Sequence, residues 1–108
     1  MSPTVSDLKI WQIVKAIPKG SILSYGEVAR RAGYPKGARQ VARALKIAPE
    51  ELNLPWHRVV GAGHRVSIPA DSAAFKRQVR LLKREGFVVK GRRIVVAEIS
   101  SLDRALWG

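Results

Sequence analysis

The sequence predicts a mainly α-helical fold with small β elements, a single domain of the winged helix-turn-helix type over residues 1–108. A chain of 108 residues builds one hydrophobic core rather than two. Hydrophobic residues make up 46% of it, which is enough for a packed core. Two short helical patterns follow one another across a glycine-containing turn, and the second carries a basic stripe. Turn-rich segments farther along the chain predict small β-ribbons.

A first helix is expected from Thr4 or Ser6 to Ile17. Thr4 and Asp7 have the spacing of a weak capping box at its start. Apolar side chains then recur at helical spacing, at Ile10, Ile13, Val14 and Ile17. Pro18 ends this helix because proline cannot continue the hydrogen-bond pattern.

The next two helices form the expected helix-turn-helix. Ser24-Tyr25-Gly26-Glu27 is a Ser-x-x-Glu capping box that starts one helix, and Gly33 is its natural end. After a turn at residues 34–37, a helix is expected over residues 38–46. Its predicted apolar face consists of Ala38, Val41, Ala42 and Leu45. A basic stripe lies opposite, at Arg39, Arg43 and Lys46; the alternative is an ordinary amphipathic helix with a solvated charged face.

The second half of the chain predicts a wing, a helix and a hairpin. Residues 58–68 contain Gly61-Ala62-Gly63 and are expected to form a small β-ribbon or wing. A fourth helix is expected over residues 71–85, ended by Gly86, with Phe75, Val79 and Leu82 inward. Its outward positions are basic, at Lys76, Arg77, Arg80, Lys83 and Arg84. Two apolar segments, residues 87–89 and 93–97, flank Lys90-Gly91-Arg92 and predict a terminal hairpin.

The charge balance points to a polyanionic ligand. The chain has 20 Lys and Arg against 8 Asp and Glu, a formal net charge of +12, which favours nucleic acid ahead of an anionic membrane surface. No apolar run has the length of a membrane span and the start of the chain lacks signal-peptide features, so a soluble, intracellular protein is expected. Cysteine is absent, which excludes disulfides, thiolate metal sites and cysteine nucleophiles. The histidines are His57 and His64, without metal-ligand spacing, and neither a metal nor a cofactor is expected.

An unusual stretch, Leu54-Pro55-Trp56-His57-Arg58-Val59-Val60, is not explained by periodicity. It resembles the Pro-Cys-His-Arg-Val active-site motif of the O6-alkylguanine-DNA alkyltransferases, with Trp56 in place of the alkyl-accepting cysteine. That substitution is the mark of the alkyltransferase-like proteins. The resemblance continues at residues 24–29, 38–45 and 84–86, in the family's order, and covers most of residues 8–88. It implies the fold of the C-terminal domain of those alkyltransferases.

The resemblance implies a non-enzymatic sensor that binds O6-alkylguanine in duplex DNA, flips it out of the helix and marks it for nucleotide excision repair. An indole has no nucleophile but stacks on a base for roughly 1–3 kcal/mol, comparable with the cost of flipping a weakly paired base. The expected partners are double-stranded DNA that contains the lesion, and the proteins of nucleotide excision repair. The protein is expected to be a monomer that associates with DNA in the cytoplasm. Two alternatives stay open: a winged-helix transcription regulator, which leaves Trp56 without a role, and a hydrolase that uses His57 with Glu85.

The resemblance also assigns roles to individual residues. Arg39 matches the arginine that fills the gap in the base stack, and Tyr25 matches the tyrosine that rotates the nucleotide. With the basic stripe, the expected DNA contacts are Tyr25, Ala38, Arg39, Arg43 and Lys46. The expected lesion pocket consists of Tyr25, Trp56, His57, Val59, Ser67 and Ala70. Arg58 and Glu85 are expected to support this pocket, since without a thiol His57 and Glu85 serve as hydrogen-bonding scaffold.

The chain departs from the family at two places. Ala48 replaces the hinge asparagine of the transferases, and the loop at residues 63–70 lacks both their tyrosine and the arginine that some alkyltransferase-like proteins place near Pro69. Ser67 and the backbone of Ala70 are therefore the candidate donors to the O6 edge of the base. Trp11 and Trp107 are expected to be packing residues.

Overall fold

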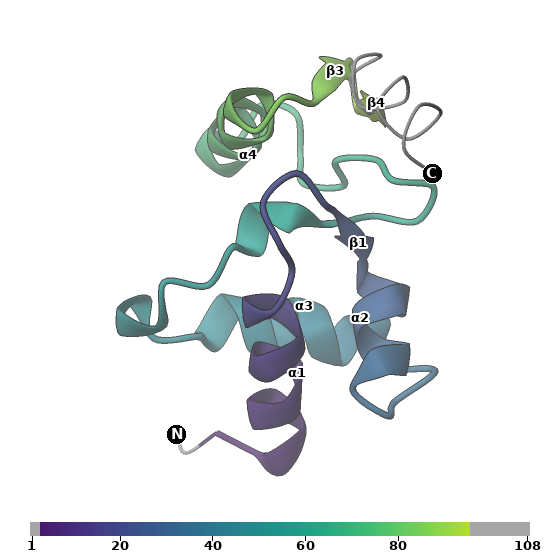
Figure 1. Cartoon of the computed structure of the whole chain (residues 1–108), viewed down its shortest axis with the longest axis vertical. Helices are drawn as coiled ribbons and strands as arrows, with labels where there is room; N and C mark the ends of the chain where they lie inside the picture. The colour runs from purple at the N-terminus through teal and green to yellow at the C-terminus, as the bar shows by residue number, and fades with distance from the viewer. Residues whose placement is uncertain (1–2, 96–108) are drawn as a thin grey trace, which may run out of the picture.

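The computed structural model describes residues 3–95 and confirms a mainly helical fold with small strands (Figure 1). The helices in this range are α1 (Val5–Lys15), α2 (Tyr25–Arg31), α3 (Ala38–Ile47) and α4 (Ala73–Arg84). The strands are β1 (Leu23–Ser24), β2 (Val59–Val60), β3 (Val88–Lys90) and β4 (Arg93–Val95). Two short 3-10 helices precede β2, η1 (Glu50–Leu52) and η2 (Trp56–Arg58). In this part of the chain, no helix combines the length and the apolar character needed to cross a membrane.

Helices α1, α2 and α3 enclose the first core cluster. Ile10, Val14, Val28, Val41 and Ala44 are fully buried there, as helical spacing requires for faces that meet. Both predicted capping boxes are present, at Thr4 with Asp7 and at Ser24 with Glu27. The indole of Trp11 lies in this core, and its Nε1 donates a hydrogen bond to the Ala44 carbonyl at 2.8 Å. Trp107 lies outside the described residues.

The turn between α2 and α3 is held tight by glycine. Gly33 follows α2 with φ +92°, a conformation that glycine adopts without strain. At Gly37, a Cβ atom would come within 2.9 Å of the Tyr34 Cβ and 3.0 Å of the Tyr34 backbone oxygen. Only glycine therefore allows the chain to pass this close to Tyr34 and enter α3, which fixes the angle of the helix-turn-helix.

The predicted apolar face of α3 is wrong at two positions. Val41 and Ala44 are buried and Leu45 packs against the core, whereas Ala38 and Ala42 are exposed. A short helix that packs on one side needs only this narrower stripe. The two alanines thus lie on the open face together with the basic residues of α3, where a small side chain lets a ligand come close to the helix backbone.

The predicted wing over residues 58–68 is also wrong in its pairing. Val59 and Val60 do not pair within that segment but align parallel to Leu23 and Ser24, in a two-stranded sheet that ties β2 to the start of α2. The turn that follows is closed by a single bridge between Gly61 and Arg65. The buried valines gain a better environment between the two core clusters than a solvent-exposed ribbon offers.

The C-terminal part packs around the second core cluster. Val60, Val66, Leu82, Phe87 and Ile94 are buried between α4 and the antiparallel ribbon β3–β4. This confirms the predicted hairpin over its described residues; positions 96 and 97 lie outside them. α4 begins at Ala73, two residues later than expected, where the Ser72 hydroxyl accepts from the Phe75 amide at 3.1 Å. α1 likewise ends at Lys15, before the expected Ile17.

Candidate functional site

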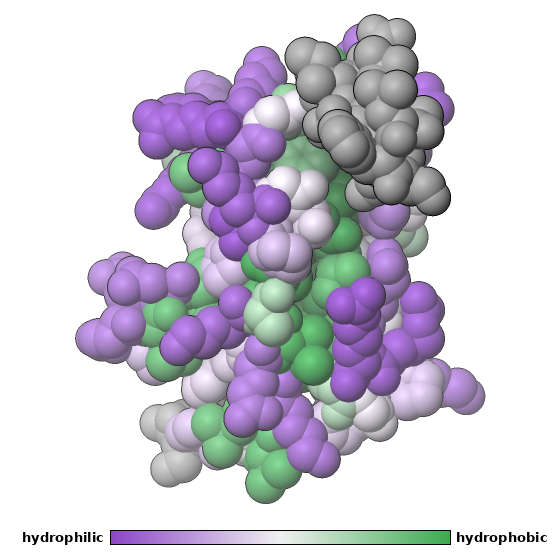
Figure 2. Space-filling model, viewed as in Figure 1, coloured by the Kyte–Doolittle hydropathy of each residue, from purple (hydrophilic) through white to green (hydrophobic). Residues whose placement is uncertain are grey.

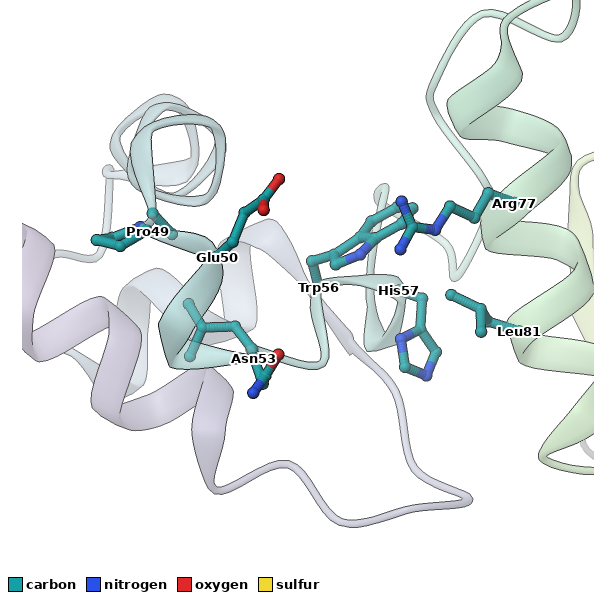
Figure 3. Close-up of a pocket in the computed structure, with 9 residues that line it drawn as sticks. Pro49, Glu50, Asn53, Trp56, His57, Arg77 and Leu81 are labelled. Atoms are coloured by element: carbon teal, nitrogen blue, oxygen red, sulfur yellow. The ribbon is translucent and has the colours of Figure 1, made fainter.

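Trp56 and His57 line a cleft of about 510 Å³ between the segment that contains η1 and the helix α4. In Figure 3, Pro49, Glu50 and Asn53 lie on one side, and Arg77 and Leu81 of α4 lie on the other. The short helix η2 holds Trp56 and His57 between these two walls. The cleft therefore has one indole, one imidazole and side chains of both charges around a single hollow.

The indole of Trp56 is half-buried and available for stacking. The Arg77 guanidinium lies over this ring, 6.0 Å from its centroid, which is a cation–π arrangement. The His57 ring meets it edge to face, with centroids 6.3 Å apart at 86°. Trp56 is thus positioned by its neighbours while part of its surface stays open to the cleft.

The carboxylate of Glu85 anchors the segment that carries Trp56. It accepts hydrogen bonds from His57 Nε2 at 2.5 Å, and from Arg58 Nε and Nη2 at 3.0 and 2.9 Å. The backbone amide of Gly20 donates to the same carboxylate at 3.2 Å, and Arg58 Nη1 donates to the Ile17 carbonyl at 2.8 Å. The side chains of Glu85 and His57 are 7% and 12% exposed, so these bonds are largely shielded from water. Three segments of the chain are joined at this one group.

Burial alone would raise the pKa of Glu85. The hydrogen bonds from Arg58, His57 and the Gly20 amide outweigh it and lower the pKa from 4.5 to about 2. The carboxylate is therefore ionised at neutral pH and acts only as an acceptor. His57 Nε2 is a donor in this bond, so its proton is committed to Glu85.

A second support comes from Gln78 on α4. Its side chain is 1% exposed, and its Nε2 donates to the carbonyls of His57 and Val59 at 3.2 and 3.0 Å. Val59 is buried in β2, so Gln78 ties this strand to α4. In the sequence, Gln78 is an amide among the apolar positions of the fourth expected helix, and this is the one feature that could have indicated its role.

The residues expected to contact DNA lie on the helix-turn-helix. Ala38, Arg39, Arg43 and Lys46 are exposed along α3, and Arg43 borders a hollow beside Trp11. Tyr25 is the first residue of α2 and packs partly against the first core. Next to it, Glu27 accepts from His64 Nε2 at 3.1 Å; hydrogen bonds from the Ser24 backbone and from His64 lower the pKa of Glu27. Their roles in DNA binding remain predictions.

The residues expected to form the lesion pocket do not all line the cleft. Trp56 and His57 lie in it, whereas Tyr25, Val59, Ser67 and Ala70 do not. Ser67 and Ala70 are exposed in the segment that follows β2, and Ser67 lies against Gly61. Sequence reasoning missed the cleft residues Glu50, Asn53, Arg77 and Leu81, because η1 and α4 are far apart along the chain and no spacing links them. Within residues 3–95, no cluster of three His, Asp or Glu side chains has the arrangement of a metal site.

Glu85→Gln should lower the free energy of unfolding at neutral pH and weaken its dependence on pH below about 5. A pKa lowered to about 2 means that the stability contributed by Glu85 is fully present above about pH 5 and is lost as the pH falls toward 2. After allowance for solvent screening, this contribution is on the order of 1–2 kcal/mol at neutral pH. Urea unfolding between pH 2 and 7 should show that the variant is less stable at neutral pH and that its free energy of unfolding falls less steeply as the pH is lowered. Glu51→Gln, at an exposed carboxylate of η1, is the matched control; an equal effect of both variants would contradict the anchoring role of Glu85.

Comparison with known proteins identifies the family of this fold and site. The family model described as "6-O-methylguanine DNA methyltransferase, DNA binding domain" matches residues 6–87. A "DNA base-flipping protein" of Escherichia coli K12 is 46% identical over 83 residues, which cover 77% of this chain and 63% of that protein. This chain thus spans less than two thirds of the length of that relative. "Alkyltransferase-like protein 1" of Schizosaccharomyces pombe is 41% identical over 78 residues, or 72% of each chain.

Solved structures agree with the sequence relatives. The crystal structure of S. pombe Atl1 in complex with damaged DNA containing O6-carboxymethylguanine superposes with a TM-score of 0.73 at 32% identity, over 94% of this chain and 95% of that one. A Mycobacterium tuberculosis OGT in complex with DNA superposes with a TM-score of 0.65 at 31% identity, over 78% of this chain and 51% of that one. With the family model matching most of its length, the chain belongs to the family of 6-O-methylguanine DNA methyltransferase DNA-binding domains, as one of the alkyltransferase-like proteins.

Proposed function

We propose that this protein is a non-enzymatic sensor of O6-alkylguanine, which binds the lesion in duplex DNA, flips the nucleotide and marks it for nucleotide excision repair. The observation that carries the proposal is Trp56, which offers an indole at the cleft in a chain without cysteine. Alkyl transfer needs a thiolate within reach of the alkyl carbon, and neither an indole nor any other group of this chain supplies one. The relatives that bind damaged DNA or flip bases support the same role.

DNA binding is assigned to α3. Its open face combines the small side chains of Ala38 and Ala42 with the guanidinium of Arg39. The alanines permit close approach to a groove, and Arg39 at the start of the helix is placed to fill the gap left by an extruded base. Arg43 and Lys46, farther along, add phosphate contacts that position the protein without reading the base. Tyr25, one helix earlier, borders the path of the rotating nucleotide.

The flipped base is held by stacking. Base stacking on an aromatic side chain contributes roughly 1–3 kcal/mol, which offsets the few kcal/mol needed to extrude a weakly paired base. Ser67 and Ala70 do not line the cleft, but they are exposed in the segment after β2, and we assign the polar edge of the base to the Ser67 hydroxyl and the Ala70 backbone. Glu85 and Arg58 keep Trp56 in place without taking part in chemistry, because their hydrogen bonds are already committed to the motif. Gln78 supports the same segment through the bonds of its Nε2 to the carbonyls of His57 and Val59.

The complex of this protein with the lesion is itself the signal for repair. A bound and kinked duplex presents a small lesion as a bulky distortion, the substrate class of excision repair, so recruitment requires no turnover here. The protein acts as a DNA-associated monomer in the cytoplasm, without a cofactor and without a membrane. The outward face of α4 is the proposed partner surface, because Lys76, Arg80, Lys83 and Arg84 are exposed there and lie on a different helix from Arg39.

Arg39→Ala should weaken lesion recognition. Loss of the group that fills the base stack should reduce binding to an O6-methylguanine duplex about tenfold or more, or ~1.4 kcal/mol, and reduce binding to the undamaged duplex less. Fluorescence anisotropy gives both affinities, and a fluorescent base analogue opposite the lesion reports extrusion. Arg80→Ala removes the same charge from α4 and should leave lesion preference unchanged. Equal losses on both duplexes, or an unaltered extrusion signal, would show that Arg39 is only a surface charge.

Excision of the lesion should depend on this protein. Purified excision-repair proteins should incise an O6-alkylguanine duplex faster when it is present, because the complex is the recognised distortion. A variant with Glu in place of Lys76, Arg80, Lys83 and Arg84 should bind the lesion but promote incision less. If the wild type only shields the lesion from incision, the signalling role fails; if the variant promotes incision normally, only the α4 surface is wrong.

A further inference from the structure

Three cationic side chains lie in one row across neighbouring strands. Lys90 and Arg93 are directly opposite in the β3–β4 ribbon, and Arg93 is bridged on its other side by Arg65. Residues directly opposite in an antiparallel pair project from the same face of the sheet. Arg65, Arg93 and Lys90 therefore form one row, which we call the ribbon cation row, and all three are exposed.

The backbone brings Arg65 and Arg93 especially close. The Ile94 amide donates to the His64 carbonyl at 3.2 Å, and the Val66 amide donates to the Arg92 carbonyl at 2.8 Å. These bonds flank the Arg65–Arg93 pair, which makes it the non-hydrogen-bonded type with the shorter separation, about 4.5 Å between Cα atoms. Two cations held in this way repel one another.

Within residues 3–95, no carboxylate neutralises this row. Glu27 is hydrogen-bonded by His64, and Glu85 is bound by His57 and Arg58; neither carboxylate contacts the row. Like charges directly opposite in a sheet destabilise it, so the row lowers the stability of the fold. An external anion removes that cost.

The row faces away from the core and continues toward the helix-turn-helix. Val89 and Ile94 point from the other face of the ribbon into the core beneath α4. The turn that carries Arg65 is tied to the first turn of α2 through His64 and Glu27, and β2 pairs with the strand that leads into α2. Figure 1 shows β4, the segment after β2, β1 and α2 following one another along one side of the molecule. A ligand along this side meets both α2 and the row.

We propose that the ribbon cation row binds the phosphate backbone of the DNA that flanks the lesion, outside the part contacted by α3. This inference rests on the proposed function. The molecule is 45 Å along its longest axis, a length of about 13 base pairs of duplex, so one duplex can reach both places. Guanidinium groups match phosphate oxygens in fork geometry. The centres of protein interfaces are instead depleted in charged residues, so phosphate is the better match for three adjacent cations with no carboxylate among them.

The test compares two variants from which equal charge is removed. The row variant carries Arg65→Gln, Lys90→Gln and Arg93→Gln; the control carries Lys76→Gln, Arg80→Gln and Lys83→Gln on α4. Binding to an O6-methylguanine duplex of about two helical turns, ~21 base pairs, is measured by anisotropy over a range of salt concentrations. The row variant should show a slope of log affinity against log salt that is shallower by about 0.9 for each phosphate that it no longer neutralises. The control should keep the wild-type slope, and both variants should keep the wild-type preference for the lesion.

Stability separates a ligand role from a structural one. Removal of mutually repelling charges should leave the melting temperature of the row variant equal to or above that of the wild type, while its DNA binding weakens. If the triple variant does not fold, Arg93→Gln removes the central charge alone and should shift the slope in the same direction. Equal slopes for the wild type and the row variant would overturn the proposal; this result is expected if Val88 and Val95 on the same face contact a protein instead. An equal shift of the slope in the row variant and in the control would also overturn it. A wild type without lesion preference would overturn the proposed function, whereas slopes on undamaged DNA still decide the role of the row.

Discussion

The carboxylate of Glu85 is the group on which the arrangement of the site depends. It lies at the end of α4 and binds His57 and Arg58 of η2 together with the backbone of Gly20. One side chain thus joins α4, η2 and the segment that follows α1. Arg58 extends the connection to the carbonyl of Ile17, just beyond α1. Because the pKa of Glu85 is lowered to about 2, this connection persists through the whole physiological pH range. The position of Trp56 follows from it, since Trp56 is the neighbour of His57 in a three-residue helix.

A network of this kind is suited to holding rather than reacting. The imidazole of His57 donates a hydrogen bond from Nε2 to Glu85, and the backbone carbonyl of His57 accepts one from Gln78, so both the ring and the main chain are fixed. What stays open is the indole, which faces a cleft whose walls come from η1 and α4 (Figure 3). Stacking needs a rigid aromatic surface and no proton transfer. The geometry therefore favours retention of a flipped base over its chemical change.

Local features of the sequence predicted the helices, whereas the pairing of strands that are far apart in the chain could not be predicted from it. Ser24 with Glu27 and the glycines at 33 and 86 marked helix ends correctly, because caps and stops act within one turn. The alignment of Val59 with Leu23 joins residues without a connecting turn, and such parallel pairs leave no periodic pattern. Trp56 and His57 were expected at the site and lie in the cleft, but Glu50 and Arg77 meet there only after folding. In Figure 2, hydrophilic residues cover much of the visible face, and apolar residues show through its middle and at its lower end. Charge alone did not indicate which cations belong to the site.

The central claim is that this protein binds an alkylated guanine and leaves it unchanged. The most direct measurement is incubation with a duplex that carries O6-methylguanine radiolabelled in the methyl group, followed by separation of native complexes and then of denatured protein and DNA. The account predicts label in the native protein–DNA complex, all of it recovered on intact O6-methylguanine after denaturation, because no thiolate is present to accept the methyl group. Label bound covalently to the protein, or released from the DNA over time, would contradict it.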